Sequence, residues 1–190
     1  MSKNTITTPT GTARYPRLNT PDTKFSDEGV YKVDLEMTAE EAKPFIEQIE
    51  AMFADFVADK KRELKKDKIK IHAAPWTEND GMVQLKLKVK ATGKSKDGET
   101  YSRQPKLFDA AGQVTTENIG GGSKLKVAVV PYCWYTASLG AGITLQPKAV
   151  QVLELHTWSS GGTAEAYGFE VTEAPRATAK TGTDSEDIEW

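Results

Sequence analysis

The stretch that decides the fold is SKLKVAVVPYCWYTASLGAGITLQPKAVQVLEL, residues 123–155. Two runs rich in β-branched and aromatic residues, 123–136 and 143–155, flank the glycine-containing turn SLGAG. Runs of this composition, bounded by a short glycine-containing segment, are typical of two antiparallel strands joined by a turn. The sequence therefore predicts a long β-hairpin here.

The segment PYCWY, residues 131–135, predicts which side chains of the hairpin point outward. In a strand, successive side chains point to opposite faces, so Tyr132 and Trp134 share one face and Cys133 and Tyr135 share the other. A free cysteine is among the most frequently buried side chains. We therefore expect Cys133 to be a packed thiol and the two rings to be displayed outward.

Further strands are predicted upstream of the hairpin. A first, irregular strand lies near TARYPRL (12–18), and GVYKVDLEM (29–37) and MVQLKLKVK (82–90) alternate apolar and polar residues. WTENDG (76–81) is interpreted as a turn, and GKSKDGET (93–100) as a hairpin turn. The inward-facing residues of the two alternating strands are predicted to be Tyr31, Val33, Leu35, Met37, Val83, Leu85, Leu87 and Val89.

One amphipathic helix interrupts the strands. From Thr38 the apolar residues recur at helical spacing, and the stripe consists of Phe45, Ile46, Ile49, Met52, Phe53, Phe56 and Val57. Thr38 and Glu41 have the spacing of a capping box, whereas Pro44 would lose a backbone hydrogen bond in a helix that begins so early. Two starts stay open: Thr38 with a break, or Pro44. The fold predicted is mainly β, a five-stranded or slightly elaborated barrel with one added helix.

Length and composition limit the domain organisation. With 190 residues and 38% apolar residues, the chain suits one domain, residues 1–171, and an acidic appendage, residues 172–190, which we expect to be disordered. The single cysteine, Cys133, excludes an internal disulfide and suits a reducing cytoplasm. No apolar run approaches the roughly 20 residues that cross a bilayer, and the first residues lack the apolar core of a signal peptide. We expect a cytoplasmic protein with no membrane contact.

Catalytic and metal motifs are missing from the sequence. His72 and His156 stand outside the motifs HExxH, CxxC and GxSxG, and one cysteine with two distant histidines does not supply the four ligands of a zinc site. The glycine run at 120–122 lacks the spacing of a phosphate-binding loop. We therefore expect no enzyme activity, no cofactor and no metal. A metal-dependent nuclease using Asp34, Glu36 or Asp109 is the remaining enzyme alternative.

Basic residues and aromatic rings are the chemistry that the strands do carry. Lys86, Lys88 and Lys90 recur at period two, and residues 82–106 hold seven bases against two acids. Such a row suits phosphates, although a solvated outer face is the alternative for one strand alone. Rings beside such a row form a platform on which unpaired bases stack. The predicted nucleic-acid contacts are Tyr132, Trp134, Lys86, Lys88, Lys90, Arg103, Lys106, Lys124, Lys126, Arg14, Tyr15, Arg17 and Trp76, the last placed in a loop. For Tyr15 and Trp76 a core or lid role stays open.

At GVYKVDL (29–35) and at IGGGSKLKVAVVPYCWY (119–135) with the hairpin that follows, the sequence resembles the single-stranded DNA-binding proteins of short-tailed bacteriophages. The resemblance implies an OB-fold barrel with an added helix and an acidic tail that ends in an aromatic residue. It also implies sequence-independent coating of single strands in phage replication, repair and recombination, in the host cytoplasm. An RNA-binding OB-fold protein is the alternative, because charge and stacking do not distinguish the sugars.

The stretch TDSEDIEW, residues 183–190, is the predicted partner-binding segment. The resemblance implies that it meets replication proteins, of which replicative DNA polymerase and helicase or primase are the expected ones. A homodimer is compatible with these features. An acidic peptide with an indole imitates a polyanion with stacked bases, so we also expect weak competition with DNA. The residues concerned are Asp184, Glu186, Asp187, Ile188, Glu189 and Trp190.

Overall fold

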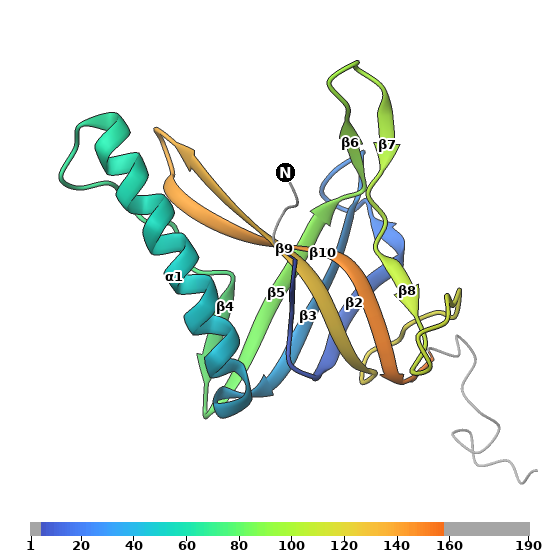
Figure 1. Ribbon diagram of the computed structural model, residues 1–190. Helices are drawn as coiled ribbons and strands as arrows, with labels where there is room; N and C mark the ends of the chain where they lie inside the picture. The colour runs from blue at the N-terminus through green and yellow to red at the C-terminus, as the bar shows by residue number, and fades with distance from the viewer. Residues whose placement is uncertain (1–4, 158–190) are drawn as a thin grey trace, which may run out of the picture. The chain divides into compact units, whose positions relative to one another are not determined.

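The structure has strands where the sequence alternates apolar and polar residues, and one helix where apolar residues recur at helical spacing (Figure 1). The computed structural model describes residues 5–157, and the predicted partner-binding segment lies outside them. Within that range the chain is mainly β with one helix, as predicted. The elements are β1 (Ile6–Thr7), β2 (Gly11–Asp22), β3 (Val30–Thr38), α1 (Ala39–Leu64), β4 (Trp76–Asn79), β5 (Met82–Lys90), β6 (Thr92–Lys94), β7 (Thr100–Ser102), β8 (Lys106–Phe108), β9 (Lys124–Thr136) and β10 (Gly140–Glu154).

Five strands pair in a closed ring. β9 pairs with β2, β2 with β3, β3 with β5, β5 with β10, and β10 with β9 again. All of these pairings are antiparallel except β5–β10, which is parallel and brings Leu87 opposite Leu145. The remaining strands extend the ring: β1 pairs with β9, β4 with β5 and β8 with β10, whereas β6 and β7 form a separate two-stranded hairpin. The predicted five-stranded barrel is therefore present, with the pairing order of an OB-fold.

The core lies inside this ring and is built from the alternating positions. The side chains predicted to face inward on β3 and β5 are buried, and Val33, Leu35 and Leu85 have no exposed surface. The hairpin β9–β10 contributes buried residues from the opposite wall, among them Leu125, Val127 and Leu145. Burying each such side chain contributes about 1.5–3 kcal/mol. The apolar face of each alternating strand is therefore held inward, and the opposite face is left on the outside, where a ligand can bind.

Helix α1 begins at the first of the two predicted positions. Thr38 is the N-cap: the backbone amide of Glu41 donates to its hydroxyl (3.3 Å), and its own amide donates to the Glu41 carboxylate (3.1 Å). The Thr38 hydroxyl also donates to the Glu41 carboxylate (2.8 Å). This bond, followed by the one from the Thr38 amide, holds the pKa of Glu41 below its usual value. Pro44 lies inside an uninterrupted helix, so the expected break is not found.

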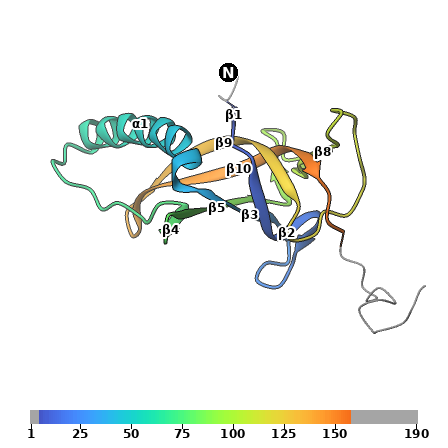
Figure 2. The same cartoon turned by 90° about the horizontal axis from the view of Figure 1, so that it is seen from below.

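The helix lies at the flank of the barrel opposite β8 (Figures 1 and 2). Its first half packs on the core through Ala42, Phe45 and Ile49, which are buried. The second half is less covered, since Phe53 and Phe56 stack on each other (6.4 Å between ring centroids) and are only half-buried. No helix within residues 5–157 is both long enough and apolar enough to span a membrane.

The prediction that WTENDG is a turn and Trp76 a loop residue is wrong. Trp76 begins β4, which runs antiparallel to β5 with Trp76 opposite Leu85, and only Asp80 and Gly81 form the turn. The indole is half-buried and packs against the core. The strand could not be predicted from the sequence because β4 is mostly polar and has no apolar period of its own. It is defined by its pairing with β5.

Candidate nucleic-acid interface

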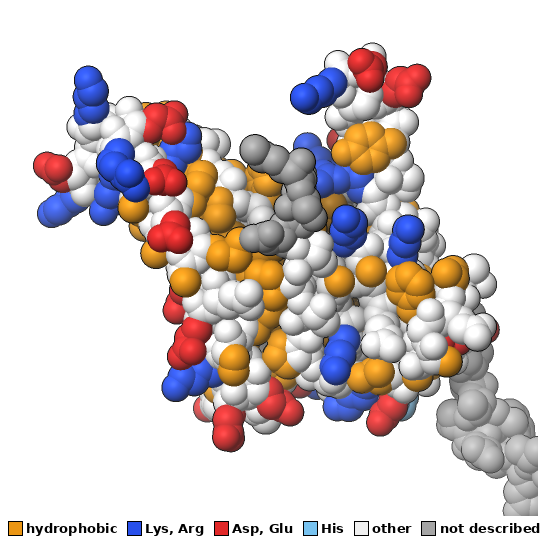
Figure 3. Space-filling model, in the orientation of Figure 1, with side chains coloured by type: hydrophobic (Ala, Val, Ile, Leu, Met, Phe, Trp, Pro, Cys, Tyr) orange, Lys and Arg blue, Asp and Glu red, His pale blue; other side chains and the backbone are white. Residues whose placement is uncertain are grey.

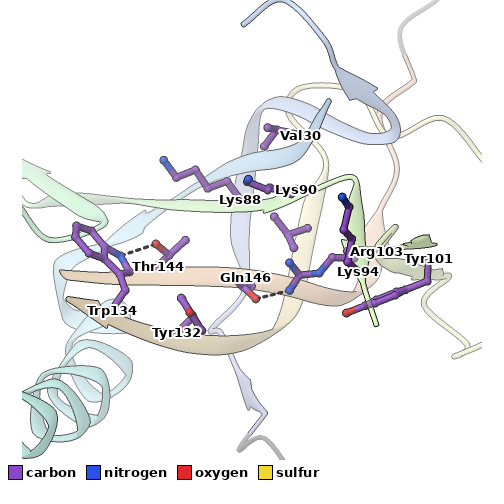
Figure 4. Close-up of a pocket in the computed structure, with 12 residues that line it drawn as sticks. Val30, Lys88, Lys90, Lys94, Tyr101, Arg103, Tyr132, Trp134, Thr144 and Gln146 are labelled. Carbon is purple, nitrogen blue, oxygen red and sulfur yellow. Dashed lines mark hydrogen bonds between the residues drawn. The ribbon is translucent and has the colours of Figure 1, made fainter. Parts of the chain in front are cut away.

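A cleft of about 570 Å³ lies between β5, the β6–β7 hairpin and the strands β9 and β10 (Figure 4). It combines rings, basic side chains and polar acceptors from strands that are far apart in the sequence. The residues that line it are Val30, Lys88, Val89, Lys90, Gly93, Lys94, Tyr101, Arg103, Tyr132, Trp134, Thr144 and Gln146.

Register and parity place these side chains on the outer face of the barrel. In the β9–β10 hairpin Tyr132 lies opposite Thr144, and Trp134 opposite Gly142. On β5 the odd-numbered residues are buried, so Lys88 and Lys90 point away from the core. Because β5 and β10 are neighbours in the ring, the lysines of one strand and the polar residues of the other border the same cleft.

Trp134 is held in a defined orientation. Its Nε1 donates a hydrogen bond to the Thr144 hydroxyl (3.2 Å), and the His72 ring lies 5.2 Å from its ring, tilted by 60°. Cys133, on the other side of the strand, packs against the core as predicted, and burial raises the pKa of its thiol. Tyr132 is an exposed residue (48%), whereas Trp134 is partly buried and less exposed. Trp134 thus offers a ring of fixed orientation, and Tyr132 adds an exposed ring on the same face of the strand.

Arg103 is also held in place before any ligand is bound. Its Nη2 donates to the Gln146 side-chain oxygen (2.8 Å), and its backbone amide donates to the Ala91 carbonyl (2.8 Å). Among the described residues that line the cleft, four are Lys or Arg and none is Asp or Glu. Lys and Arg side chains gather at the base of the β6–β7 hairpin, and at its tip acidic side chains lie beside a basic one (Figure 3). The cleft is therefore suited to an anionic ligand.

The structure brings five of the predicted contact residues together in this cleft and leaves eight outside its lining. Those inside are Lys88, Lys90, Arg103, Tyr132 and Trp134, and those outside are Lys86, Lys106, Lys124, Lys126, Arg14, Tyr15, Arg17 and Trp76.

Three of the basic residues outside the cleft lining lie close to other polar groups. Arg14 forms an ion pair with Glu36 (2.8 Å), Lys124 donates to the Thr12 hydroxyl (2.7 Å), and Lys86 lies opposite Asp34. Burial raises the pKa of Asp34 above its usual value, although the charges of Lys86 and Lys32 act in the opposite direction. Of these three, only Arg14 has its charge compensated by an ion pair, which makes it less available to a phosphate.

Sequence reasoning missed Tyr101, Thr144 and Gln146, and it counted Lys94 only among the seven bases of residues 82–106. Tyr101 follows the hairpin turn predicted at 93–100, so a signal was present: an aromatic residue paired across a short hairpin with a glycine, here Gly93. Thr144 and Gln146 belong to the predicted strand of β10, and their parity places them on its outer face.

The carboxylates of the nuclease alternative do not converge. Glu36 pairs with Arg14, and Asp109 accepts a hydrogen bond from the backbone amide of Gln113 (2.9 Å). Within residues 5–157, no three His, Cys, Asp or Glu side chains are grouped as ligands of a metal ion would be.

Comparison with known proteins places this geometry in a family. The chain is 29% identical to the single-stranded DNA-binding protein of Enterobacteria phage T3, over 99% of this chain and 91% of the relative. It is 32% identical to that of Escherichia phage T7, over 91% of this chain and 84% of the relative. The crystal structure of a single-stranded DNA-binding protein encoded by bacteriophage T7 superimposes with a TM-score of 0.71 at 28% identity, covering 97% of this chain and 100% of that chain.

A more distant structure shares the fold. The single-stranded DNA-binding protein of bacteriophage Enc34, solved in complex with single-stranded DNA, matches with a TM-score of 0.54 at 14% identity, over 82% of this chain and 89% of that chain. The family model described as the single-stranded DNA-binding protein of bacteriophage T7 matches residues 10–155, which include the whole cleft and all five strands of the ring. The chain therefore belongs to the family of bacteriophage single-stranded DNA-binding proteins represented by that of phage T7.

Proposed function

We propose that the protein binds single-stranded DNA in the cleft between β5, β9 and β10, without regard to base sequence. The observation that carries the proposal is the meeting of Tyr132 and Trp134 with four basic side chains in one cleft whose described lining has no acid. Aromatic rings stack on any base, each stack contributing about 1–3 kcal/mol, and the basic side chains neutralise phosphates. Neither interaction reads a base edge, so the binding is general.

Single strands are preferred because stacking requires a free base face, which a duplex does not offer. A protein that binds any single strand in this way is suited to coat and protect strands exposed during phage DNA replication, repair and recombination. Membership of the phage family and the solved complex of the Enc34 relative with single-stranded DNA support this role.

Titration of oligo(dT) and of a duplex of equal length, at several salt concentrations, tests the proposal. Four to six neutralised phosphates give a slope of log affinity against log salt of roughly −3 to −4, at about −0.7 per contact. Equal affinity for duplex and single strand would refute the stacking mechanism. Competition with RNA of the same sequence shows whether the ligand is DNA or, as in the alternative of an RNA-binding OB-fold protein, RNA.

The protein acts, in this proposal, as a binder and not as an enzyme. The family is one of binding proteins. Of the candidate carboxylates, Glu36 pairs with Arg14, Asp109 accepts a hydrogen bond from the amide of Gln113, and Asp34 lies opposite Lys86. Incubating an end-labelled single strand with the protein and Mg²⁺ or Mn²⁺ is the check. Shortened strands would restore the nuclease alternative.

Residues 172–190 are, in the same proposal, the segment that recruits replication proteins in the host cytoplasm. They lie outside the described residues, so the support comes from their composition. Five acidic side chains against two basic ones steer the segment toward a basic partner, and Ile188 and Trp190 supply apolar area for a pocket. A replicative DNA polymerase and a helicase or primase are the partners to test. A homodimer is the oligomeric state to test by sedimentation.

A further inference from the structure

Two aromatic rings in the cleft share one unusual arrangement. Trp134 on β9 lies directly opposite Gly142 on β10, and Tyr101 on β7 lies directly opposite Gly93 on β6. The two pairs belong to different sheets. Figure 4 shows Trp134 and Tyr101 at opposite ends of the cleft, with Lys88, Lys90 and Arg103 between them.

Each ring occupies the space that a side chain on its glycine would fill. A Cβ atom at Gly142 would lie 2.6 Å from Cε2 and 2.7 Å from Cη2 of Trp134. A Cβ atom at Gly93 would lie 2.7 Å from Cζ and 2.8 Å from Oη of Tyr101. Neither glycine has a positive φ, so the backbone does not demand glycine at these positions. Glycine is required by the rings instead, because each ring lies over the backbone of the facing strand and leaves no room for a Cβ atom.

We propose that Tyr101 is a second base-stacking platform of the cleft, and that Gly93 and Gly142 are positioning residues that let both rings lie across the strands. The ligand class is a nucleobase of single-stranded DNA, so the inference rests on the proposed function and extends it. A ring supported by the backbone loses little freedom when a base stacks on it, which favours binding. Tyr101 is 49% exposed, close to the 48% of Tyr132, and has surface to offer.

Two platforms at opposite ends of a basic cleft make a length-dependent site. A strand of a few nucleotides reaches one platform, and a longer strand crosses Lys88, Lys90 and Arg103 and reaches the other. Affinity should therefore rise with length until both rings are covered, within the range of about 4–16 nucleotides of known OB-fold sites.

A purely structural role is the competing explanation, because an aromatic residue that covers a cross-strand glycine can stabilise a hairpin without any ligand. The two roles differ in their length dependence. A ring that only supports the β6–β7 hairpin affects strands of every length alike, whereas a platform at one end of the cleft affects only those that reach it.

The first experiment measures the affinity of the full-length protein for oligo(dT) of about 2 to 16 nucleotides. Tyr101→Ala should reduce the affinity for long strands by about 5- to 150-fold and leave the shortest that bind unchanged. Tyr101→Phe, which keeps the ring, should retain most of the affinity. Phe56→Ala on α1 is the control for removing a half-buried ring elsewhere, and thermal unfolding followed by circular dichroism checks each fold.

Either an unchanged affinity of Tyr101→Ala at every length or an equal loss at every length overturns the assignment of Tyr101. The same series includes Trp134→Ala, which distinguishes a failure of the proposed DNA-binding function from a failure of the role of Tyr101. If Trp134→Ala also leaves binding unchanged, the proposed function in this cleft fails. If only Tyr101→Ala does so, the cleft stands and the second platform fails.

The second experiment is a double-mutant cycle on the better-isolated pair, since the three atoms nearest to a Cβ at Gly142 all belong to Trp134. Gly142→Ala in the native background should reduce affinity about as much as Trp134→Ala does, because the methyl group displaces the indole. In the Trp134→Ala background the same change should have no further effect. An equal loss in both backgrounds would show that Gly142 does not act through the ring.

Discussion

Lys88 illustrates how a single residue gains a function from its position. It is exposed, lines the cleft, and takes part in none of the ion pairs found among residues 5–157. Its charge is therefore available to a phosphate. Lys88→Ala should flatten the slope of log affinity against log salt by about 0.7, the contribution of one contact on a single strand. Lys43→Ala on α1 removes the same charge from an exposed site outside the cleft and should leave the slope nearly unchanged. Equal slopes for the two variants would remove Lys88 from the phosphate path.

Asp34 and Asp22 are carboxylates on neighbouring strands whose pKa values shift in opposite directions. Burial raises the pKa of Asp34, so its charged form is disfavoured in the fold. The hydrogen bond from Lys32 lowers the pKa of Asp22, with the amide of Lys24 as a second donor. A carboxylate with a raised pKa contributes stability at low pH, which is lost as the pH rises through its pKa in the folded protein. A carboxylate with a lowered pKa contributes stability at neutral pH, which is lost as the pH falls through its pKa in the folded protein.

Asp34→Asn should therefore stabilise the protein at neutral pH, by under about 1 kcal/mol because the carboxylate is only half-buried and water screens it. The gain should vanish as the pH falls below the ordinary Asp value of about 3.9. Asp22→Asn is the matched control and should destabilise at neutral pH, with the loss vanishing at low pH. Urea unfolding between about pH 3 and pH 7 measures both. Two variants with the same sign at neutral pH would contradict this reading of the environments.

At the scale of single residues, the sequence could predict only what period two controls. Alternation around Cys133 placed Tyr132 and Trp134 on the outer face, and alternation on β5 did the same for Lys88 and Lys90. It could not place Tyr101 in the same cleft, because Tyr101 reaches the cleft through a separate hairpin, β6–β7. Nor could it show that Arg14 pairs with Glu36, 22 residues away.

At the scale of elements, the start of α1 shows a local signal that outweighs a contrary one. The capping box at Thr38 satisfies two backbone donors, and Pro44 costs one hydrogen bond without ending the helix. Thr38→Ala should reduce the free energy of unfolding by about 1 kcal/mol at neutral pH. Because Thr38 supplies the hydrogen bonds that lower the pKa of Glu41, this loss should shrink as the pH falls below about 4.3 and through the lowered value. Guanidinium unfolding at several pH values tests it, and a loss that does not change with pH would contradict the role of Glu41.

The strands themselves were predictable where one face is buried, and not where pairing alone defines them. β3 and β5 carry a clear period of two, and β9 and β10 carry one over parts of their length. β4 carries none, so Trp76 was misplaced. The parallel pairing of β5 with β10, which closes the ring and forms one wall of the cleft, joins residues 87 and 145, and no local pattern indicates contacts at that separation.

For the whole molecule, charge is unevenly distributed along the chain. The net charge is −2, but residues 173–190 hold five acids and two bases, and the remaining residues hold 23 bases and 22 acids. Removing residues 173–190 therefore turns a weakly negative molecule into a weakly positive one. DNA, a polyanion, is repelled less by the shortened chain, so its association should be faster and its affinity higher.

Salt should set the size of that effect. At about 0.01 M salt the Debye length is about 30 Å, so charges far from the cleft still act on the DNA, whereas at about 0.1 M it is about 10 Å. Deleting residues 173–190 should thus tighten oligo(dT) binding most at low salt and little at high salt. Trp190→Ala keeps all five acids and should leave DNA affinity nearly unchanged, while it weakens binding to a purified replicative polymerase or helicase, because the indole supplies the buried apolar area and the charges mainly steer. A deletion that changes neither DNA affinity at low salt nor polymerase and helicase binding would contradict both roles proposed for this segment. A loss of partner binding in the deletion but not in Trp190→Ala would assign the contact to the acids and Ile188 instead.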